Sequence, residues 1–276
     1  MKFTKMQGIG NDYIYVNLFT ETVQDPEALA RRLSDRHFGI GGDGLVLIGP
    51  SDRADFRMTM YNADGSRGRM CGNAARCIGR YVHDHRMTDQ RAFTLETDSG
   101  VRDILLHLEK DEVTNITVDM GAPVTDCEKV PCILGHGVVC RHGIRALGRQ
   151  LEITPVSMGN PHGVIFLDEP VESFEVARYG RALETDPVFP EKANIEFANV
   201  LSRDCVKMRV WERGSGITLA CGTGACAVFA AGTLCGYLDT RVKILLEGGS
   251  LVTEWKGDHI LLTGGAEEVF EGEIRL

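Results

Sequence analysis

Two cysteines in matching contexts are the residues of this sequence best suited to chemistry. Cys71 opens Cys-Gly-Asn-Ala-Ala-Arg and Cys221 opens Cys-Gly-Thr-Gly-Ala-Cys, and an apolar helical stretch follows each. This context predicts that each cysteine lies at a helix amino terminus, where free N–H groups and the helix dipole stabilise negative charge. We therefore expect thiol pKa values that fall from about 8.5 toward neutrality. The same N–H groups can bind a carboxylate, and the glycine after each cysteine lets it approach closely.

The surroundings of the two cysteines repeat along the chain. Landmark residues lie 9, 27 and 60 or 61 positions before each cysteine. In pairs from the first and second half, they are Asn62 and Glu212, Gly44 and Asn194, and Asn11 and Asn160. This register predicts two copies of one domain, offset by about 150 residues. We place the join near residues 119–123, where Gly and Pro interrupt the strand pattern.

A duplicated domain of this kind suits inversion at a carbon atom. Two facing helix ends that hold one small carboxylate would present a thiol to each face of its α-carbon. One thiolate could then remove the α-proton while the opposite thiol delivers a proton to the other face. The helix ends would stabilise the charge that develops on the carboxylate.

Structural roles are the alternative for several of these residues. His162 alone is more typical of a structural histidine, Glu212 with Arg213 could be a solvated pair, and asparagines are common in turns. The remaining cysteines are more typical of small buried side chains: Cys77, Cys127, Cys132, Cys140, Cys205, Cys226 and Cys235.

The composition narrows the class of protein. The 276 residues are 43% hydrophobic and 25% charged, which is typical of packed domains. A net charge of −9 argues against a nucleic-acid or anionic-membrane partner. Nine cysteines without Cys-x2-Cys spacing, and no apolar signal segment in residues 1–16, indicate reduced thiols in the cytoplasm and no metal site. The 25 uncharged residues between Arg213 and Asp239 include many glycines, so we expect a buried helix there rather than a membrane span.

Short alternating strands and a few helices predict an α+β fold. Helices are expected from Asp25 to about Asp35 and from about Glu172 to Leu183, and hairpin turns at Asp98-Ser99-Gly100 and Gly248-Gly249. The expected strands are 56–61, 93–97, 104–108, 163–167, 206–211, 242–246, 251–255 and 260–263.

Taken together, the ordered motifs resemble the diaminopimelate epimerase family along essentially the whole chain. In the first half they are Met6 to Asp12 (MQGIGND), Gly39 to Gly44 (GIGGDG), Tyr61 to Ser66 (YNADGS) and Met70 to Arg76 (MCGNAAR). In the second half they are Gly159 to His162 (GNPH), Ala193 to Phe197 (ANIEF), Trp211 to Gly214 (WERG) and Ala220 to Gly224 (ACGTG).

The resemblance implies a cytoplasmic isomerase that converts LL-diaminopimelate to meso-diaminopimelate without pyridoxal phosphate or another cofactor, in lysine and peptidoglycan precursor synthesis. Cys71 and Cys221 match its acid/base pair, and His162 and Glu212 match positions that assist the thiols. Substrate-binding positions of the family match Asn11, Asn62, Gly72, Asn73, Asn160, Asn194, Glu212, Arg213, Gly222 and Thr223.

The resemblance also implies a fold and an assembly. The fold is two pseudo-symmetric domains, each a mostly antiparallel curled sheet around a central helix. Here they would be residues 1–119, with a returning strand at 266–276, and residues 120–265. Members of the family are commonly homodimers.

Some relatives carry glutamine where this chain has Gly44, so a side-chain contact from that position is absent here. The resemblance therefore does not identify which residues bind the distal head group of the substrate. Two alternatives to this function remain: a related racemase of another amino acid, such as histidine or proline, and a thiol-rich metal or redox module without turnover. Pyridoxal phosphate chemistry is disfavoured because no Gly-rich phosphate loop opens a helix near a lysine.

Overall fold

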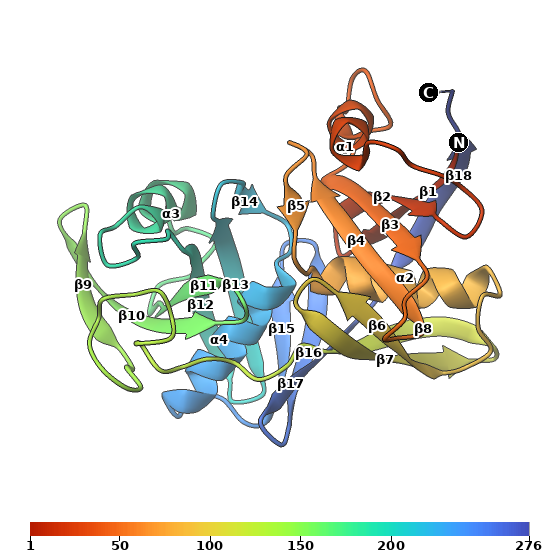
Figure 1. The fold of residues 1–276 in the computed structure, drawn as a ribbon. Helices are drawn as coiled ribbons and strands as arrows, with labels where there is room; N and C mark the ends of the chain where they lie inside the picture. The colour runs from red at the N-terminus through yellow and green to blue at the C-terminus, as the bar shows by residue number, and fades with distance from the viewer. Residues whose placement is uncertain (276) are drawn as a thin grey trace. The chain divides into compact units, whose positions relative to one another are not determined.

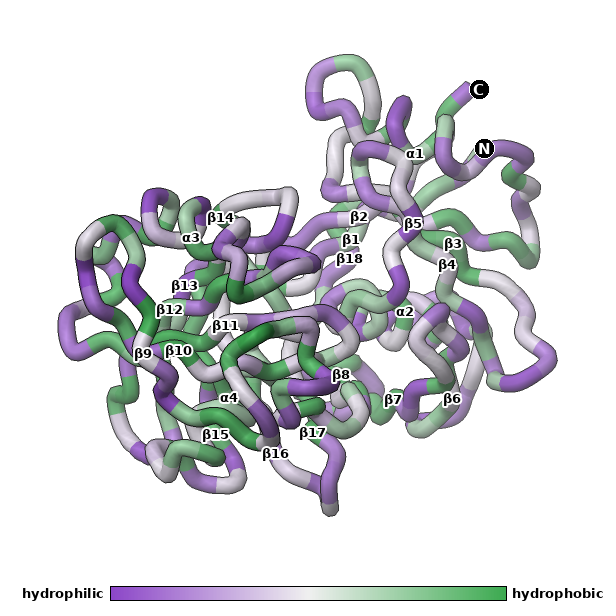
Figure 2. Tube along the Cα trace, turned by 60° about the vertical axis from the view of Figure 1, so that its left-hand side comes forward, coloured by the Kyte–Doolittle hydropathy of each residue, from purple (hydrophilic) through white to green (hydrophobic). Residues whose placement is uncertain are grey.

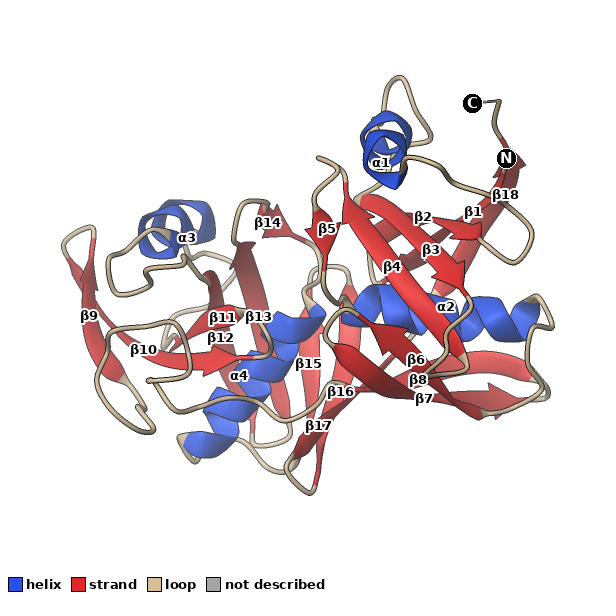
Figure 3. Cartoon of the chain, viewed as in Figure 1, coloured by secondary structure: helices blue, strands red, loops and turns tan. Residues whose placement is uncertain are grey.

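The computed structural model describes residues 1–275, which form two compact units (Figures 1 and 3). Unit 1 comprises Met1–Asp119 with residues 263–275, and unit 2 comprises Met120–Leu262. Among the described residues there are four helices against many short strands, and most strand pairs are antiparallel. The α+β class predicted from the sequence is confirmed.

Unit 1 has two short parallel contacts inside an otherwise antiparallel arrangement. Strand β2 pairs in parallel with β3, and β4 pairs in parallel with β6. The antiparallel partners are β1 with β2 and β18, β3 with β4, β4 with β5, β6 with β7, and β7 with β8. The elements are β1 (Lys2–Gly8), β2 (Asn11–Asn17), α1 (Pro26–Ser34), β3 (Gly44–Gly49), β4 (Phe56–Asn62), β5 (Arg67–Gly68), α2 (Gly72–Asp84), β6 (Ala92–Thr97), β7 (Gly100–Glu109), β8 (Glu112–Asp119) and β18 (Glu267–Glu273).

Unit 2 repeats this connectivity. Strand β11 is parallel to β12, β12 is antiparallel to β13, and β13 pairs with β14 and, in parallel, with β15. Antiparallel pairs also join β9 to β10, β10 to β11, and β15 to β16. The elements are β9 (His142–Ala146), β10 (Arg149–Ser157), β11 (Pro161–Phe166), α3 (Val176–Glu184), β12 (Asn194–Ser202), β13 (Cys205–Glu212), β14 (Gly216–Thr218), α4 (Gly222–Leu234), β15 (Arg241–Leu246), β16 (Gly249–Lys256) and β17 (His259–Gly264).

The strand registers confirm the internal repeat at the level of single residues. Tyr13 lies opposite Gly44 in the β2–β3 pair, and His162 lies opposite Asn194 in the β11–β12 pair. Gly44 and Asn194 are each 27 residues before the cysteine of their own unit. Equivalent positions in the two units can therefore be compared directly.

One helix of each unit lies in its interior. Helix α2 packs on β1, β7 and β8, and Gly79 faces Ile104, Leu106 and Ile116 closely enough that a Cβ there would lie 2.9 Å from Ile116. Helix α4 packs on β10, β11, β12 and β16, and its residues are apolar or small and nearly all buried. Figure 2 colours the chain by hydropathy and shows the apolar strand β3 in green. The buried helix expected between Arg213 and Asp239 is confirmed, and none of the helices in residues 1–275 has the length and apolar character to span a membrane.

The eight predicted strands differ from the observed strands by one to four residues at one or both ends, and two further elements also differ. Helix α3 begins at Val176 rather than near Glu172, because residues 171–174 form turns and Glu175 is the N-cap. The last strand ends at Glu273, and residue 276 of the predicted strand lies outside the described residues. The N-cap of α1 at Asp25, with Pro26 as its first residue, is confirmed, as are the two hairpin turns.

Candidate active site

Both candidate cysteines cap a buried helix. Cys71 is the N-cap of α2 and Cys221 the N-cap of α4, and both have extended backbone angles. The Ala74 N–H lies 3.5 Å from Cys71 Sγ, and the Gly224 N–H lies 3.4 Å from Cys221 Sγ. Sulfur takes the place of the usual capping oxygen, which leaves each thiol at the positive end of a helix dipole. The predicted helix-end position of both thiols is confirmed.

In unit 1, amide groups surround the Cys71 thiol. Cys71 Sγ lies 3.5 Å from Asn11 Oδ1, and Asn73 Nδ2 donates to the same oxygen at 3.3 Å. The start of β2 supplies Asn11 and the first turn of α2 supplies Asn73, so two elements fix one oxygen beside the sulfur. The structure thus brings together three of the predicted site residues.

Asp43 orients the side chain of Asn11. Its Oδ2 accepts from Asn11 Nδ2 at 2.7 Å and from the Asp12 N–H at 3.1 Å. Burial is the main cause that raises the pKa of Asp43, and the charge of Asp12 adds to it. Arg36 bridges Asp12 and Asp43, and Lys5 pairs with Asp12 at 2.6 Å. Sequence reasoning missed Asp43, although it stands inside the GIGGDG motif.

A buried cation lies beneath the Cys71 cap. Arg76 is fully buried in α2 and donates to Asn73 Oδ1 at 2.8 Å and to the Gly72 carbonyl at 3.3 Å. Arg76 also donates to the Gly265 carbonyl at 3.2 Å. A buried guanidinium needs such partners, because desolvation without them is costly. Arg76 therefore fixes the first turn of α2 and orients the Asn73 amide.

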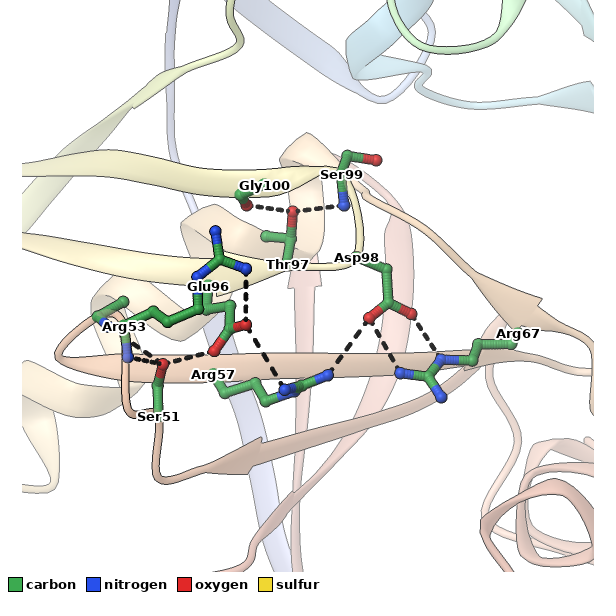
Figure 4. Close-up of polar contacts among 10 residues, drawn as sticks. Ser51, Arg53, Arg57, Arg67, Glu96, Thr97, Asp98, Ser99 and Gly100 are labelled. Atoms are coloured by element: carbon green, nitrogen blue, oxygen red, sulfur yellow. Dashed lines mark hydrogen bonds and ion pairs between the residues drawn. The ribbon is translucent and has the colours of Figure 1, made fainter.

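Ion pairs outside the cap hold the strand that leads to Cys71 (Figure 4). Arg67 of β5 forms a two-armed contact with Asp98, at 2.5 and 2.9 Å. Arg57 lies between Asp98 and Glu96, 3.6 Å from each, and Glu96 also meets Arg53 at 3.5 Å. This network links β5 to β4 and to the turn after β6.

In unit 2, the Cys221 thiol is 5% exposed and lies among different groups. Thr223 Oγ1 is 3.5 Å from the sulfur, and Asn194 Nδ2 is 4.0 Å from it. Asn194 Oδ1 in turn accepts from the Arg213 N–H at 2.8 Å, which fixes the chain as it leaves β13. The Arg213 side chain is exposed and donates to the Glu191 carbonyl at 2.8 Å.

Glu212 brings a carboxylate to Cys221. It ends β13 and accepts a short hydrogen bond from Thr218 Oγ1. Burial raises the pKa of Glu212, while interactions with Thr218 and with the Cys221 thiol oppose the rise. A carboxyl group with a raised pKa next to a thiol is suited to exchange a proton with it.

His162 lies in a fully buried polar pair. Its Nδ1 is 2.7 Å from Glu196 Oε1, and its Nε2 is 3.1 Å from Asn160 Oδ1. Both His162 and Glu196 are 0% exposed. Adjacent strands position them, because β11 carries His162 and β12 carries Glu196.

Comparison with known proteins identifies the family. The family model described as diaminopimelate epimerase matches residues 3–125 and 154–269. The chain belongs to the diaminopimelate epimerase family. The diaminopimelate epimerase of Agathobacter rectalis is 48% identical, covering 99% of both chains, and that of Desulfovibrio desulfuricans is 50% identical, covering 99% of this chain and 98% of that protein. The resemblance inferred from the sequence motifs is thereby confirmed.

Solved structures outside this family share its fold. A hydroxyproline epimerase from Agrobacterium vitis superposes with a TM-score of 0.73 at 13% identity, covering 99% of this chain and 90% of that chain. A PhzF-family phenazine biosynthesis protein from Bacillus anthracis gives 0.69 at 16% identity, covering 100% and 99%. Identities this low establish only that the two-domain fold of the diaminopimelate epimerase family is shared.

The expectation of a lowered thiol pKa is wrong for Cys221. Its pKa is raised well above the ordinary value, first because the thiol is buried and then because Glu212 and Glu196 place negative charge nearby. Hydrogen bonds from Thr223 and from the Gly224 N–H oppose this rise but do not overcome it. Burial of the thiol and the two nearby carboxylates therefore account for the raised pKa, and the placement of the carboxylates depends on strand register rather than on the Cys-Gly motif.

The other predicted site residues lie at the same strand and helix ends. Gly72 and Gly222 are the first residues of α2 and α4, and both are buried. Asn62 ends β4 and lies in a turn, where its Nδ2 donates to Ser66 Oγ at 3.0 Å. For Asn62 the structure thus shows the turn role left open by the sequence, and its substrate role stays a prediction.

Gly44 fits its site only as glycine. A Cβ at this position would lie 2.0 Å from the carbonyl oxygen of Tyr61 and 2.8 Å from the Tyr13 ring. A relative with glutamine there must therefore have a different local backbone.

One cluster among the described residues has the spacing of metal ligands. His85 caps the carboxyl end of α2, and Glu268 and Glu271 lie on β18. Cys71 caps the opposite end of this 13-residue helix, which spans about 20 Å. The cluster is therefore separate from the groups around Cys71.

Proposed function

We propose that this chain is a cofactor-independent epimerase that interconverts LL- and meso-diaminopimelate through the thiols of Cys71 and Cys221. The observation that carries the proposal is the repeated thiol cap, one in each copy of a duplicated unit, in a chain of the diaminopimelate epimerase family. The named relatives match over nearly their full length, which supports the same substrate here.

The proposed reaction moves protons only. Cys221 gives its proton to Glu212, and the resulting thiolate removes the α-proton of the substrate. Cys71 then donates its thiol proton to the opposite face of the α-carbon, which completes inversion. The cycle closes when Cys71 regains a proton and Glu212 releases one. The reverse reaction exchanges the two thiol roles.

Binding groups for a substrate with two amino-acid head groups are present in both units. The N–H groups at the starts of α2 and α4 suit the carboxylate at the reacting carbon and stabilise charge as it develops there. Amides and one cation suit the distal head group, which must find partners for its buried charges. The amides are Asn11, Asn62, Asn73, Asn160 and Asn194 and the cation is Arg213, while the carboxylate of Glu212 and the hydroxyl of Thr223 complete the proposed binding set.

Hydrogen exchange tests the proposal directly. In heavy water, the enzyme should exchange the α-hydrogen of LL-diaminopimelate for deuterium as the meso isomer forms, which mass spectrometry and NMR would follow. Incubation of a panel with histidine and proline provides the substrate control. Exchange on one of these amino acids but not on diaminopimelate would contradict the proposed substrate.

We also infer that the enzyme is a homodimer and works in the cytoplasm. Val269 and Phe270 of β18 are 56% and 45% exposed, which is unusual for large apolar side chains in adjacent positions. Nine cysteines, an odd number, are more typical of thiols in a reducing compartment than of a disulfide framework. Light scattering during gel filtration tests the assembly, and a mass of one chain at micromolar concentration would contradict it.

A further inference from the structure

Glu196 is a buried carboxylate to which the proposed mechanism assigns no role. Its Oε1 is 2.7 Å from His162 Nδ1, whereas its Oε2 has no hydrogen-bond partner among residues 1–275. Both residues of this pair are 0% exposed. A buried carboxylate with one oxygen unpartnered is costly to keep, so its presence calls for an explanation.

Glu196 lies beside the Cys221 thiol. A Cβ built on Gly224 would be 2.8 Å from Glu196 Oε1 and 3.3 Å from Cys221 Sγ, so the carboxylate oxygen and the sulfur lie at most about 6 Å apart. The same oxygen contacts His162, so Glu196 Oε1 lies near both the imidazole of His162 and the thiol of Cys221. The negative charge of Glu196 is also a cause of the raised Cys221 pKa, after burial and Glu212.

Unit 1 shows that the fold does not need a carboxylate at this position. The matched registers make Val46 of β3 the counterpart of Glu196, and Tyr13 the counterpart of His162. Val46 is 0% exposed and packs in the core of its unit. Since the apolar Val46 fills this position in unit 1, folding of the unit does not require a charge there. The charge of Glu196 in unit 2 is therefore explained by the Cys221 site of that unit.

We propose that Glu196 is a positioning residue of the Cys221 site, which holds the imidazole of His162 through Nδ1 and keeps a negative charge beside the thiol. The contact between His162 Nδ1 and Glu196 Oε1 turns Nε2 toward Asn160. The titratable groups around the thiol are Glu212 from β13, Glu196 from β12 and, through Glu196, His162 from β11. This inference rests on the proposed catalytic role of Cys221.

The test is Glu196→Gln, which keeps the shape of the side chain and removes its charge. Iodoacetamide alkylation of Cys221, followed by peptide mass spectrometry as a function of pH, should show a midpoint lower by roughly half a pH unit or more. The Cys71 midpoint should not move. With diaminopimelate, kcat should fall about 10- to 100-fold with KM within about threefold, as for other groups that orient a catalytic residue.

Two further variants separate positioning from simple structural support. Glu96→Gln neutralises a buried carboxylate in unit 1 and should leave the Cys221 midpoint unchanged. Glu196→Asp retains the charge with a shorter arm, so it should lower kcat while the midpoint stays near that of the parent. A Cys221 midpoint in Glu196→Gln equal to that of the parent would overturn the inference. If Glu196→Gln does not fold, unchanged kcat in Glu196→Asp would overturn it instead.

The alkylation measurement and the kinetic measurement test this inference and the proposed function separately. Alkylation needs no substrate, so failure to turn over diaminopimelate would defeat the proposed function and leave the charge coupling standing.

Discussion

The Cys71 and Cys221 sites share a backbone and differ in charge. Each thiol caps a buried helix and receives an N–H from the third residue after it, at 3.5 and 3.4 Å. Around Cys71 the nearest polar groups are amides, supported by the buried cation Arg76. Around Cys221 the charges of two carboxylates, Glu212 and Glu196, act on the thiol, and the position that matches Arg76 is Cys226.

The difference shows which features of the duplicated unit are fixed by the fold. The helix cap follows from local backbone geometry, so both copies retain it. The charges depend on single side chains on strands, which can change without disturbing the sheet. The charged groups around the two thiols therefore differ, and Cys221, whose pKa is raised, needs a proton acceptor nearby.

Removal of either thiol should have the largest effect. Cys71→Ala or Cys221→Ala should lower epimerisation by about 10³-fold or more, because each removes a proton-transfer group for one face of the carbon. Conversion of LL- to meso-diaminopimelate measured by chiral chromatography checks this. Cys205→Ala, which removes a thiol outside both sites, is the control. Near-normal turnover in either variant would end the two-thiol mechanism.

Replacement of Glu212 should lower kcat and raise the thermal stability of the protein. Glu212→Gln removes the proton acceptor for Cys221, so kcat should fall about 10²- to 10³-fold.

The gain in stability should depend on pH. Because the folded protein holds a proton on Glu212 to higher pH than the unfolded chain, the contribution of Glu212 is fully present below its unfolded pKa and is lost as pH rises through the raised folded pKa. Thermal unfolding of Glu212→Gln should therefore show a higher Tm than the parent at pH 8, and the difference should vanish near pH 4. A Tm lower than that of the parent at pH 8 would contradict the raised pKa.

The sequence predicted the parts of the site that depend on local patterns. The Cys-Gly motif before an apolar stretch predicted both helix caps, and the matched spacing predicted the repeat. It did not predict Asp43 and Glu196 as members of the site. Both act through strand register, which brings Asp43 to Asn11 and Glu196 to His162 across 32 and 34 residues of chain. The raised pKa of Cys221 was missed because it depends first on burial of the thiol and then on carboxylates from other strands.

A change at Asp43 should affect only the Cys71 side. Asp43→Asn weakens the contact that orients Asn11, so kcat should fall about 10-fold, the scale expected for a group that orients a site residue. The alkylation midpoint of Cys221 should stay that of the parent, because Asp43 belongs to unit 1 and contacts Asn11, Asp12 and Arg36. A shift of that midpoint would show that the two thiols are not electrically separate.

The smallest effect is expected from the ion pair that holds β5. Asp98→Asn removes the two-armed contact with Arg67, whose side chain is 47% exposed, so solvent screens much of the interaction. We expect a loss of about 1 kcal/mol or less in the free energy of unfolding, and kcat within about twofold of the parent. Urea unfolding and steady-state kinetics check both. Glu254→Gln removes the comparable exposed pair with Arg241 in unit 2 and should give a similar small loss. A positioning residue is expected to change kcat by more than about tenfold. If Asp98→Asn lowers kcat by that much, then strand β5 before Cys71 sets the position of the thiol, and the amides of Asn11 and Asn73 alone do not.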